Sequence, residues 1–157
     1  MRAEAQAHID QINAATALLR RFLDWDRANR RLQELNAKVE DSALWDNPKA
    51  AQEVMRERQR LEQAIAATRA IERELSDTAE LIELAESEGD TDLVEDGIRS
   101  LAELADRAER DKVAALQQQQ QALQQRQAAS QRPSGPSQPP PPVVNYPNSG
   151  LPTQNSL

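Results

Sequence analysis

Few residues in this sequence are suited to catalysis or metal binding, and those few are scattered. The 157 residues include one histidine, His8, and no cysteine, so thiolate metal sites and disulfides are excluded. The four glycines stand apart from one another, which leaves no glycine-rich loop to cradle a phosphate. No serine lies in the setting of a nucleophile elbow. We therefore predict that the protein is not an enzyme and has no catalytic residue, no cofactor and no metal ligand.

Charged side chains are plentiful, and their densest cluster runs from Glu53 to Glu62. Acids and arginines are interleaved there at separations of three and four residues, the spacing at which side chains meet on a helix. Such surface pairs are each worth only about a few tenths of a kcal/mol. We interpret the cluster as a solvated helix face, and a specific docking patch is the alternative interpretation.

The overall charge narrows the possible partners. Twenty-six acidic and 19 basic residues give a net charge of −7. This balance disfavours unaided binding to DNA or RNA, which takes clustered lysine and arginine, but it allows docking on a basic protein. No apolar run approaches the roughly 20 residues of a membrane span, and the first residues lack the apolar stretch of a secretory signal. We expect a cytoplasmic protein that binds neither DNA nor a membrane.

The composition changes abruptly at Leu116 and divides the chain into residues 1–116 and residues 117–157. All the acidic residues precede this point, and eight of the nine prolines follow it. The glutamine run at 117–121 should prolong the preceding helix and then fray. The rest is a low-complexity Gln/Pro/Ser-rich tail that we predict to be disordered, with polyproline II at Pro139–Pro142. Docking of the proline tract into an SH3-like groove is the alternative.

Residues 1–116 have the hydrophobic spacing of three helices. Apolar residues recur every three or four positions from Ile9 to Val39, which predicts one long helix. Asn47 can cap a second helix that starts at Pro48 and runs to about residue 86, with a possible break near Ser76. Gly89 should end this helix. A third helix follows, capped by Asp90 or Thr91 and weakened at its start by Gly97, since glycine costs about 1 kcal/mol relative to alanine.

Each helix carries a single narrow apolar stripe, so each must bury that stripe against a neighbour. The short connections favour antiparallel neighbours. The fold class we predict is all-α, with three long helices in an antiparallel coiled-coil-like bundle followed by the disordered tail. Single stripes on long helices also make self-association through the helices an expected property.

Two segments go beyond what a plain coiled coil needs. Residues 20–26 read Arg-Arg-Phe-Leu-Asp-Trp-Asp, and residues 44–48 read Leu-Trp-Asp-Asn-Pro. In order and spacing, they resemble the N-terminal domain of the bacterial peptide chain release factor 2 family, over about three quarters of the chain. We interpret the signature side chains as structural, with one indole packing over helix ends while its N–H reaches a carbonyl. The signature residues are Phe22, Trp25, Trp45 and Pro48.

The resemblance implies a role in translation termination. Release factors of this class enter the ribosome at a stop codon and trigger hydrolysis of peptidyl-tRNA. Their helical N-terminal domain is expected to lie near the ribosomal GTPase-associated centre, against the stalk-base protein. The family's Gly-Gly-Gln loop and Ser-Pro-Phe element, which carry hydrolysis and codon reading, do not occur in these 157 residues. None of the family's catalytic or codon-reading residues can therefore be carried over to a position here.

Two interpretations follow. The first is a truncated or frame-disrupted release-factor-like domain, or one joined to an unrelated tail, that is related to termination but unable to catalyse it. The second is an acidic coiled-coil adaptor or scaffold protein, unrelated to termination, that resembles the family only through shared helical composition.

Overall fold

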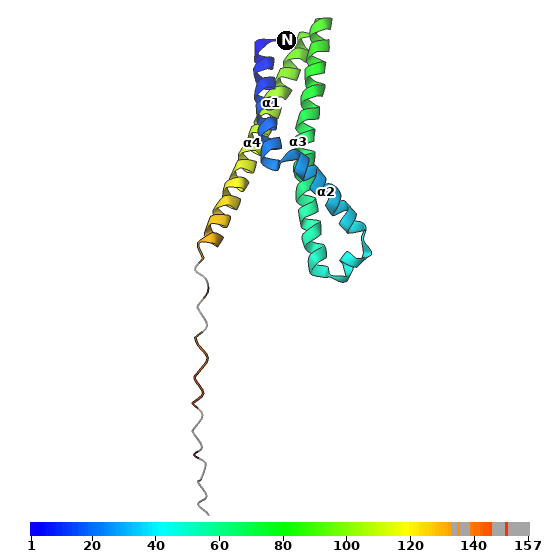
Figure 1. Cartoon of the computed structure of the whole chain (residues 1–157). Coiled ribbons are helices and arrows are strands. Elements are labelled where there is room, and N and C mark those ends of the chain that lie inside the picture. The colour runs from blue at the N-terminus through cyan, green and yellow to red at the C-terminus, as the bar shows by residue number, and fades with distance from the viewer. Residues whose placement is uncertain (133–134, 136–138, 146–149, 151–157) are drawn as a thin grey trace, which may run out of the picture.

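The computed structural model describes residues 1–132, 135, 139–145 and 150, and its secondary structure is entirely helical there (Figure 1). Helices α1 (Ala3–Leu23) and α2 (Trp25–Glu40) are followed by the 3₁₀ helix η1 (Ser42–Asp46). Two long helices follow, α3 (Pro48–Glu88) and α4 (Thr91–Ser130). The all-α class predicted from the sequence is confirmed.

The single helix predicted from Ile9 to Val39 is wrong, because the chain bends at Asp24 and forms two helices. Asp24 adopts a left-handed conformation (φ 54°, ψ 72°), and its N–H contacts the carbonyls of Arg20 and Arg21. Aspartate is one of the few residues besides glycine that tolerate this conformation. The bend lets α1 pack on both α4 and α3 while α2 packs mainly on α3, although their apolar spacing is continuous.

The ends of α3 follow the sequence closely. The Asn47 side chain accepts a hydrogen bond from the Ala50 N–H, and Gly89 ends the helix at φ 70°. Asp90 caps α4 by accepting from the Leu93 N–H. The possible break near Ser76 is not present, because α3 is one helix of 41 residues and the Ser76 hydroxyl contacts Glu80 within it.

The apolar side chains gather in two separate cores. The larger one lies among α1, the second half of α3 and the first half of α4, and the smaller one lies between α2 and the first half of α3 (Figure 1). We call these parts the three-helix half (residues 1–23 and 68–115) and the hairpin (residues 25–65). The larger core comprises Ala5, Ile12, Ala15, Leu19, Ile71, Leu75, Ile82, Ala85, Val94, Ile98, Leu101, Leu104, Ala105 and Ala108, and the smaller one comprises Ala28, Leu35, Leu61 and Ile65.

The helices of the three-helix half are not all antiparallel. The N-terminal amine of Met1 lies 3.3 Å from Glu86, and Arg2 lies 4.0 Å from Glu95, so α1 and α4 start at the same end. They then run in the same direction, and α3 runs against both (Figure 1). Helices joined by a short connection, α2 with α3 and α3 with α4, are therefore antiparallel, as predicted. The difference from the predicted single bundle is the bend at Asp24, which divides the packing into the three-helix half and the hairpin, with α3 in both.

Gly97 has a packing role that the sequence did not reveal. It is buried where α3 and α4 meet, and a β-carbon added there would lie 2.5 Å from Cγ1 of Ile82. Only glycine lets the two helices approach this closely. The free-energy cost of a glycine inside a helix is thus offset by the close packing that Gly97 permits.

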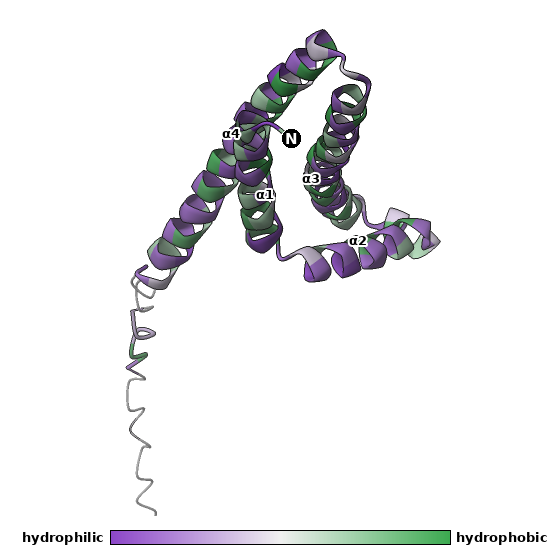
Figure 2. Cartoon of the chain, turned by 90° about the horizontal axis from the view of Figure 1, so that it is seen from above, coloured by the Kyte–Doolittle hydropathy of each residue, from purple (hydrophilic) through white to green (hydrophobic). Residues whose placement is uncertain are grey.

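Helix α4 continues well past Leu116, so the expectation that the glutamine run prolongs it is confirmed. Residues 117–130 are helical and exposed, whereas Pro139–Pro142 are exposed and in neither helix nor strand. The remainder of the predicted disordered tail falls largely on residues outside those the structure describes. Hydrophilic and hydrophobic residues are interspersed along the labelled helices (Figure 2). No described helix is long and apolar enough to span a membrane.

Candidate docking surface

The four signature residues lie at two separate places, one at each end of α2. Phe22 and Trp25 are half-buried beside the bend at Asp24. Trp45 and Pro48 are exposed at the tip of the hairpin, where η1 leads into α3. The two places differ in how much of their aromatic side chains is exposed to solvent.

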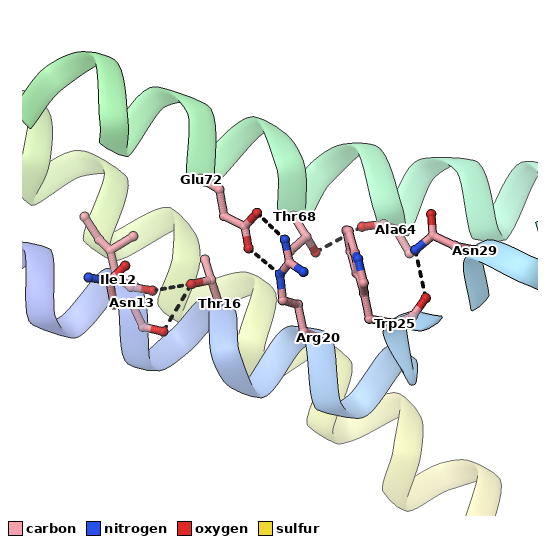
Figure 3. Close-up of polar contacts among 9 residues, drawn as sticks. All are labelled: Ile12, Asn13, Thr16, Arg20, Trp25, Asn29, Ala64, Thr68 and Glu72. Carbon is pink, nitrogen blue, oxygen red and sulfur yellow. Dashed lines mark hydrogen bonds and ion pairs between the residues drawn. The ribbon is translucent and has the colours of Figure 1, made fainter. Parts of the chain in front are cut away.

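At the bend, an arginine is held between a carboxylate and an indole (Figure 3). Arg20 donates from Nε and Nη2 to the two oxygens of Glu72 at 2.6 and 2.7 Å, and its guanidinium lies 4.1 Å from the centre of the Trp25 ring. The hydrogen bond to Glu72 is the main cause that raises the pKa of Arg20. These contacts tie α1 and the start of α2 to α3, so the bend is a fixed joint and its aromatic ring is already occupied.

The buried polar groups near this joint are satisfied within their own helices. The Thr16 hydroxyl donates to the carbonyl of Ile12 at 3.0 Å, and the Thr68 hydroxyl donates to that of Ala64 at 3.1 Å (Figure 3). Among the described residues, no buried side-chain nitrogen or oxygen lacks a partner. The buried polar groups near the joint therefore make contacts within the fold.

The hairpin is held by polar pairs as well as by its small core. Arg31 of α2 donates to both oxygens of Glu57 of α3, at 2.7 and 2.9 Å, and Arg58 donates from Nε to Asn36 at 2.7 Å. The Arg31–Glu57 hydrogen bond is the largest cause that raises the pKa of Arg31 and lowers the pKa of Glu57. Part of the charged cluster at residues 53–62 thus joins two helices instead of only facing solvent.

Trp45 is fixed in place yet open to solvent. Its indole N–H donates to the carbonyl of Val39 at 3.2 Å, as expected from the sequence, while 53% of the residue remains exposed. Asp41 starts η1 by accepting from the Ala43 N–H, which orders the turn that carries the indole. The ring is thereby pre-positioned with one face available for contact.

An open groove of about 630 Å³ lies beside this indole, along the outer face of α3. Pro48, Gln52, Met55 and Gln59 follow one another at separations of three and four residues, so they form a line on one helix face. Met55 is 38% exposed, and Arg56 lies exposed on the groove wall. The groove is lined by Trp45, Pro48, Ala51, Gln52, Met55, Arg56, Arg58, Gln59 and Glu62.

One protein family matches most of this chain, including most of the hairpin. The PCRF domain family matches residues 28–138, which include most of α2, all of α3 and all of α4. This chain belongs to the PCRF domain family. The matched part of the PCRF domain contains Trp45, Pro48 and the whole groove, whereas Phe22 and Trp25 precede it.

This chain is similar to part of peptide chain release factor 2 from several bacteria. The factor of Paramagnetospirillum magneticum is 47% identical over 116 residues, which are 74% of this chain and 31% of that protein. The factor of Roseobacter denitrificans is 46% identical over the same shares, and that of Caulobacter vibrioides is 50% identical over 93 residues, 59% of this chain and 25% of that protein. The chain thus spans about a third or less of the length of these relatives.

Charge is distributed unevenly along the chain. Residues 25–62, which form most of the hairpin, carry eight acidic and eight basic side chains, whereas residues 63–116 carry fifteen acidic and six basic ones. The described residues contain no group of three or more acidic or histidine side chains placed to hold a metal ion. The groove itself is partly apolar, and its charged lining residues are Arg56, Arg58 and Glu62.

Trp45 and Pro48 were predicted from the sequence as structural residues, and a docking patch at residues 53–62 was only the alternative interpretation. Met55 and the groove were not predicted. The signal was present, since the line through Met55 lies beside the inward line of Val54, Leu61 and Ile65 on the same helix. Only the fold, in which the chain reverses and places Trp45 beside this line, shows that the line forms part of a groove.

Proposed function

We propose that this protein acts in translation termination, as a release-factor-2-like helical domain that docks on the ribosome near its GTPase-associated centre. The observation that supports this most is the similarity to release factor 2 across a PCRF domain that includes the exposed Trp45 groove. The stalk-base protein is the proposed contact and the cytoplasm the proposed place of action. The family match is what favours this role over an unrelated acidic adaptor.

The hairpin tip has the residue types that dominate binding energy at protein interfaces. Tryptophan and arginine are enriched among such residues, and methionine adapts its shape to a partner. Trp45 is held by its hydrogen bond to Val39, so little side-chain freedom is lost when a partner covers it. The proposed docking surface is therefore Trp45, Met55 and Arg56 with the groove between them.

We propose a binding role without catalysis of peptidyl-tRNA hydrolysis. The 157 residues contain neither a Gly-Gly-Gln loop nor a Ser-Pro-Phe element. The groove holds no nucleophile beside a base. The chain should therefore occupy a site on the ribosome without releasing a peptide, and recognition of DNA is not part of the proposal.

Co-sedimentation with ribosomes tests the docking role. The unchanged chain should pellet with ribosomes, and the Trp45→Ala/Met55→Ala variant should bind at least about thirtyfold more weakly, since loss of two central contacts costs about 2 kcal/mol or more. A matched control, Leu81→Ala/Leu84→Ala, removes two leucines that are 41% and 55% exposed on α3 and should bind normally. Circular dichroism establishes that each variant is folded.

Two outcomes would overturn the proposal. One is ribosome binding that is absent in the unchanged chain or equal in both variants. The other is stop-codon-dependent release of peptide from peptidyl-tRNA by this chain alone, which would show catalysis instead of docking.

A further inference from the structure

The exposed apolar surface of the hairpin comes chiefly from two side chains. Among residues 25–65, all of which the structure describes, the exposed large apolar residues are Trp45 and Met55, at 53% and 38%. Both line the groove, and the exposed residues Gln52, Arg56 and Gln59 around them are polar. A chemical change at Met55 therefore alters a large share of the apolar surface that the groove offers to a partner.

Met55 also carries the one sulfur atom of the hairpin. The chain has two methionines and no cysteine, so a peroxide meets no thiolate here that would react first. Met55 belongs to neither of the two cores, and the groove that it lines is open to solvent. A small oxidant can thus reach this thioether without any unfolding of the hairpin.

Oxidation converts the thioether into a group of different character. Hydrogen peroxide transfers one oxygen atom to a lone pair of the sulfur. An S–O bond forms, the O–O bond breaks, the sulfur loses two electrons and the remainder of the peroxide leaves as water. The product, methionine sulfoxide, is polar where the thioether was apolar. Two thiols of a methionine sulfoxide reductase reverse the step, giving the thioether, water and a disulfide.

We propose that Met55 is a peroxide-sensitive modification site, and that its conversion to the sulfoxide weakens docking through the groove. A partner that covers the oxidised side chain must remove water from the new S–O group, which is unfavourable unless a hydrogen bond replaces that water. The hairpin itself should stay folded, because the modified side chain lies outside its core. The inference rests on the proposed function, since it concerns the regulation of the same groove.

The second methionine of the chain is an internal reference. Met1 is 43% exposed, and its amine lies 3.3 Å from Glu86, near the other end of α3. The 31 residues between Met55 and Glu86 separate the two sites by roughly 45 Å along this helix. Both methionines meet the oxidant in one sample, but only Met55 lies in the groove.

Peroxide treatment of the full chain, followed by removal of the peroxide, tests the proposal. Mass spectrometry of peptides should show that Met55 is oxidised about as readily as Met1. The oxidised chain should co-sediment with ribosomes about tenfold or more weakly than the untreated chain, and methionine sulfoxide reductases should restore its binding. Circular dichroism should show unchanged helix content. Resistance of Met55 under conditions that convert Met1 would overturn the inference.

The Met55→Leu variant separates an effect in the groove from an effect elsewhere. It has no sulfur in the groove and keeps Met1, so peroxide treatment should not change its affinity for ribosomes, whatever that affinity is. Equal binding of the treated and untreated natural chain, or the same peroxide-induced loss in Met55→Leu, would overturn the inference and leave the docking role intact. Absence of ribosome binding before any treatment would refute docking itself, and the inference with it.

Protection by a bound ribosome gives a second readout. An excess of ribosomes should slow the oxidation of Met55 relative to that of Met1, because the partner covers the groove and not the far end of α3. If the chain pellets with ribosomes while the ratio of the two oxidation rates stays the same, Met55 is not covered in the complex and the inference is wrong.

Discussion

The three-helix half and the hairpin share α3 but are stabilised by different means. The three-helix half buries fourteen core residues, whereas the hairpin buries four and adds the Arg31–Glu57 and Arg58–Asn36 contacts between its helices. The candidate docking groove lies on the less deeply packed part. This division is common in proteins, since binding regions are often drawn from the elements of lower local stability. The three-helix half serves as the scaffold, and the hairpin presents the surface.

Truncation of one leucine in each core should give the largest and most informative difference. Leu101 and Leu35 are both fully buried. Leu101→Ala should lower the free energy of unfolding by about 2–5 kcal/mol, since it leaves a cavity in the larger core. Leu35→Ala should mainly loosen the hairpin, with faster amide exchange confined to residues 25–65. Urea titration and hydrogen exchange measure the two effects, and faster exchange throughout the chain in Leu35→Ala would contradict the division.

A smaller effect is expected where the two long helices touch. Gly97→Ala should destabilise the three-helix half by about 1–2 kcal/mol, because overpacking against Ile82 outweighs the better helix propensity of alanine. Ser100→Ala, at an exposed position of the same helix, is the matched control and should be neutral or slightly stabilising. Thermal unfolding compares them, and a gain in stability for Gly97→Ala would show that the close approach is not required.

The stability of the hairpin should fall at low pH, because the Arg31–Glu57 pair stabilises it in addition to its small core. The pKa of Glu57 is lowered mainly by its hydrogen bond with Arg31, so its stabilising contribution is present above the ordinary carboxyl pKa of 4.5. That contribution is lost as pH falls through the lowered pKa. Amide exchange in residues 25–65 should therefore show an acid-dependent loss of protection that Glu57→Gln removes. Identical pH dependence in both proteins would indicate that the pair contributes nothing.

The smallest effect concerns the joint between the two parts. Asp24→Gly should raise the free energy of unfolding by no more than about 1 kcal/mol, because glycine adopts the left-handed conformation without strain. The larger entropy of glycine in the unfolded chain offsets part of the gain. Asp24→Ala, which keeps the strain and loses the tolerance of aspartate, should be destabilising. Equal stability of the two variants would argue against strain at this position.

Local signals in the sequence predicted much of this fold. Asn47, Gly89 and Asp90 mark helix ends through side-chain and backbone preferences that act within a few residues. The bend at Asp24 was missed because the apolar spacing runs through it without interruption, and only the separate partners of α1 and α2 distinguish a bend from a straight helix. The division of the apolar side chains into two separate cores is likewise a tertiary property that no local pattern encodes.

The candidate site could be predicted only in part. Trp45 and its hydrogen bond to a carbonyl follow from the turn that carries it. Met55 and the groove depend on the position of the η1 turn against α3, and the partial pairing of the charged cluster at residues 53–62 depends on where α2 lies. Trp45 was therefore predicted only as a structural residue, and its place beside a groove was not predicted.

Hydrogen exchange of the chain with and without ribosomes tests the central claim most directly, because it reports which part a ribosome covers. We predict slower exchange on ribosome binding within residues 45–59, with little change in the three-helix half. Protection confined to residues 63–116, with the hairpin tip unchanged, would contradict the account.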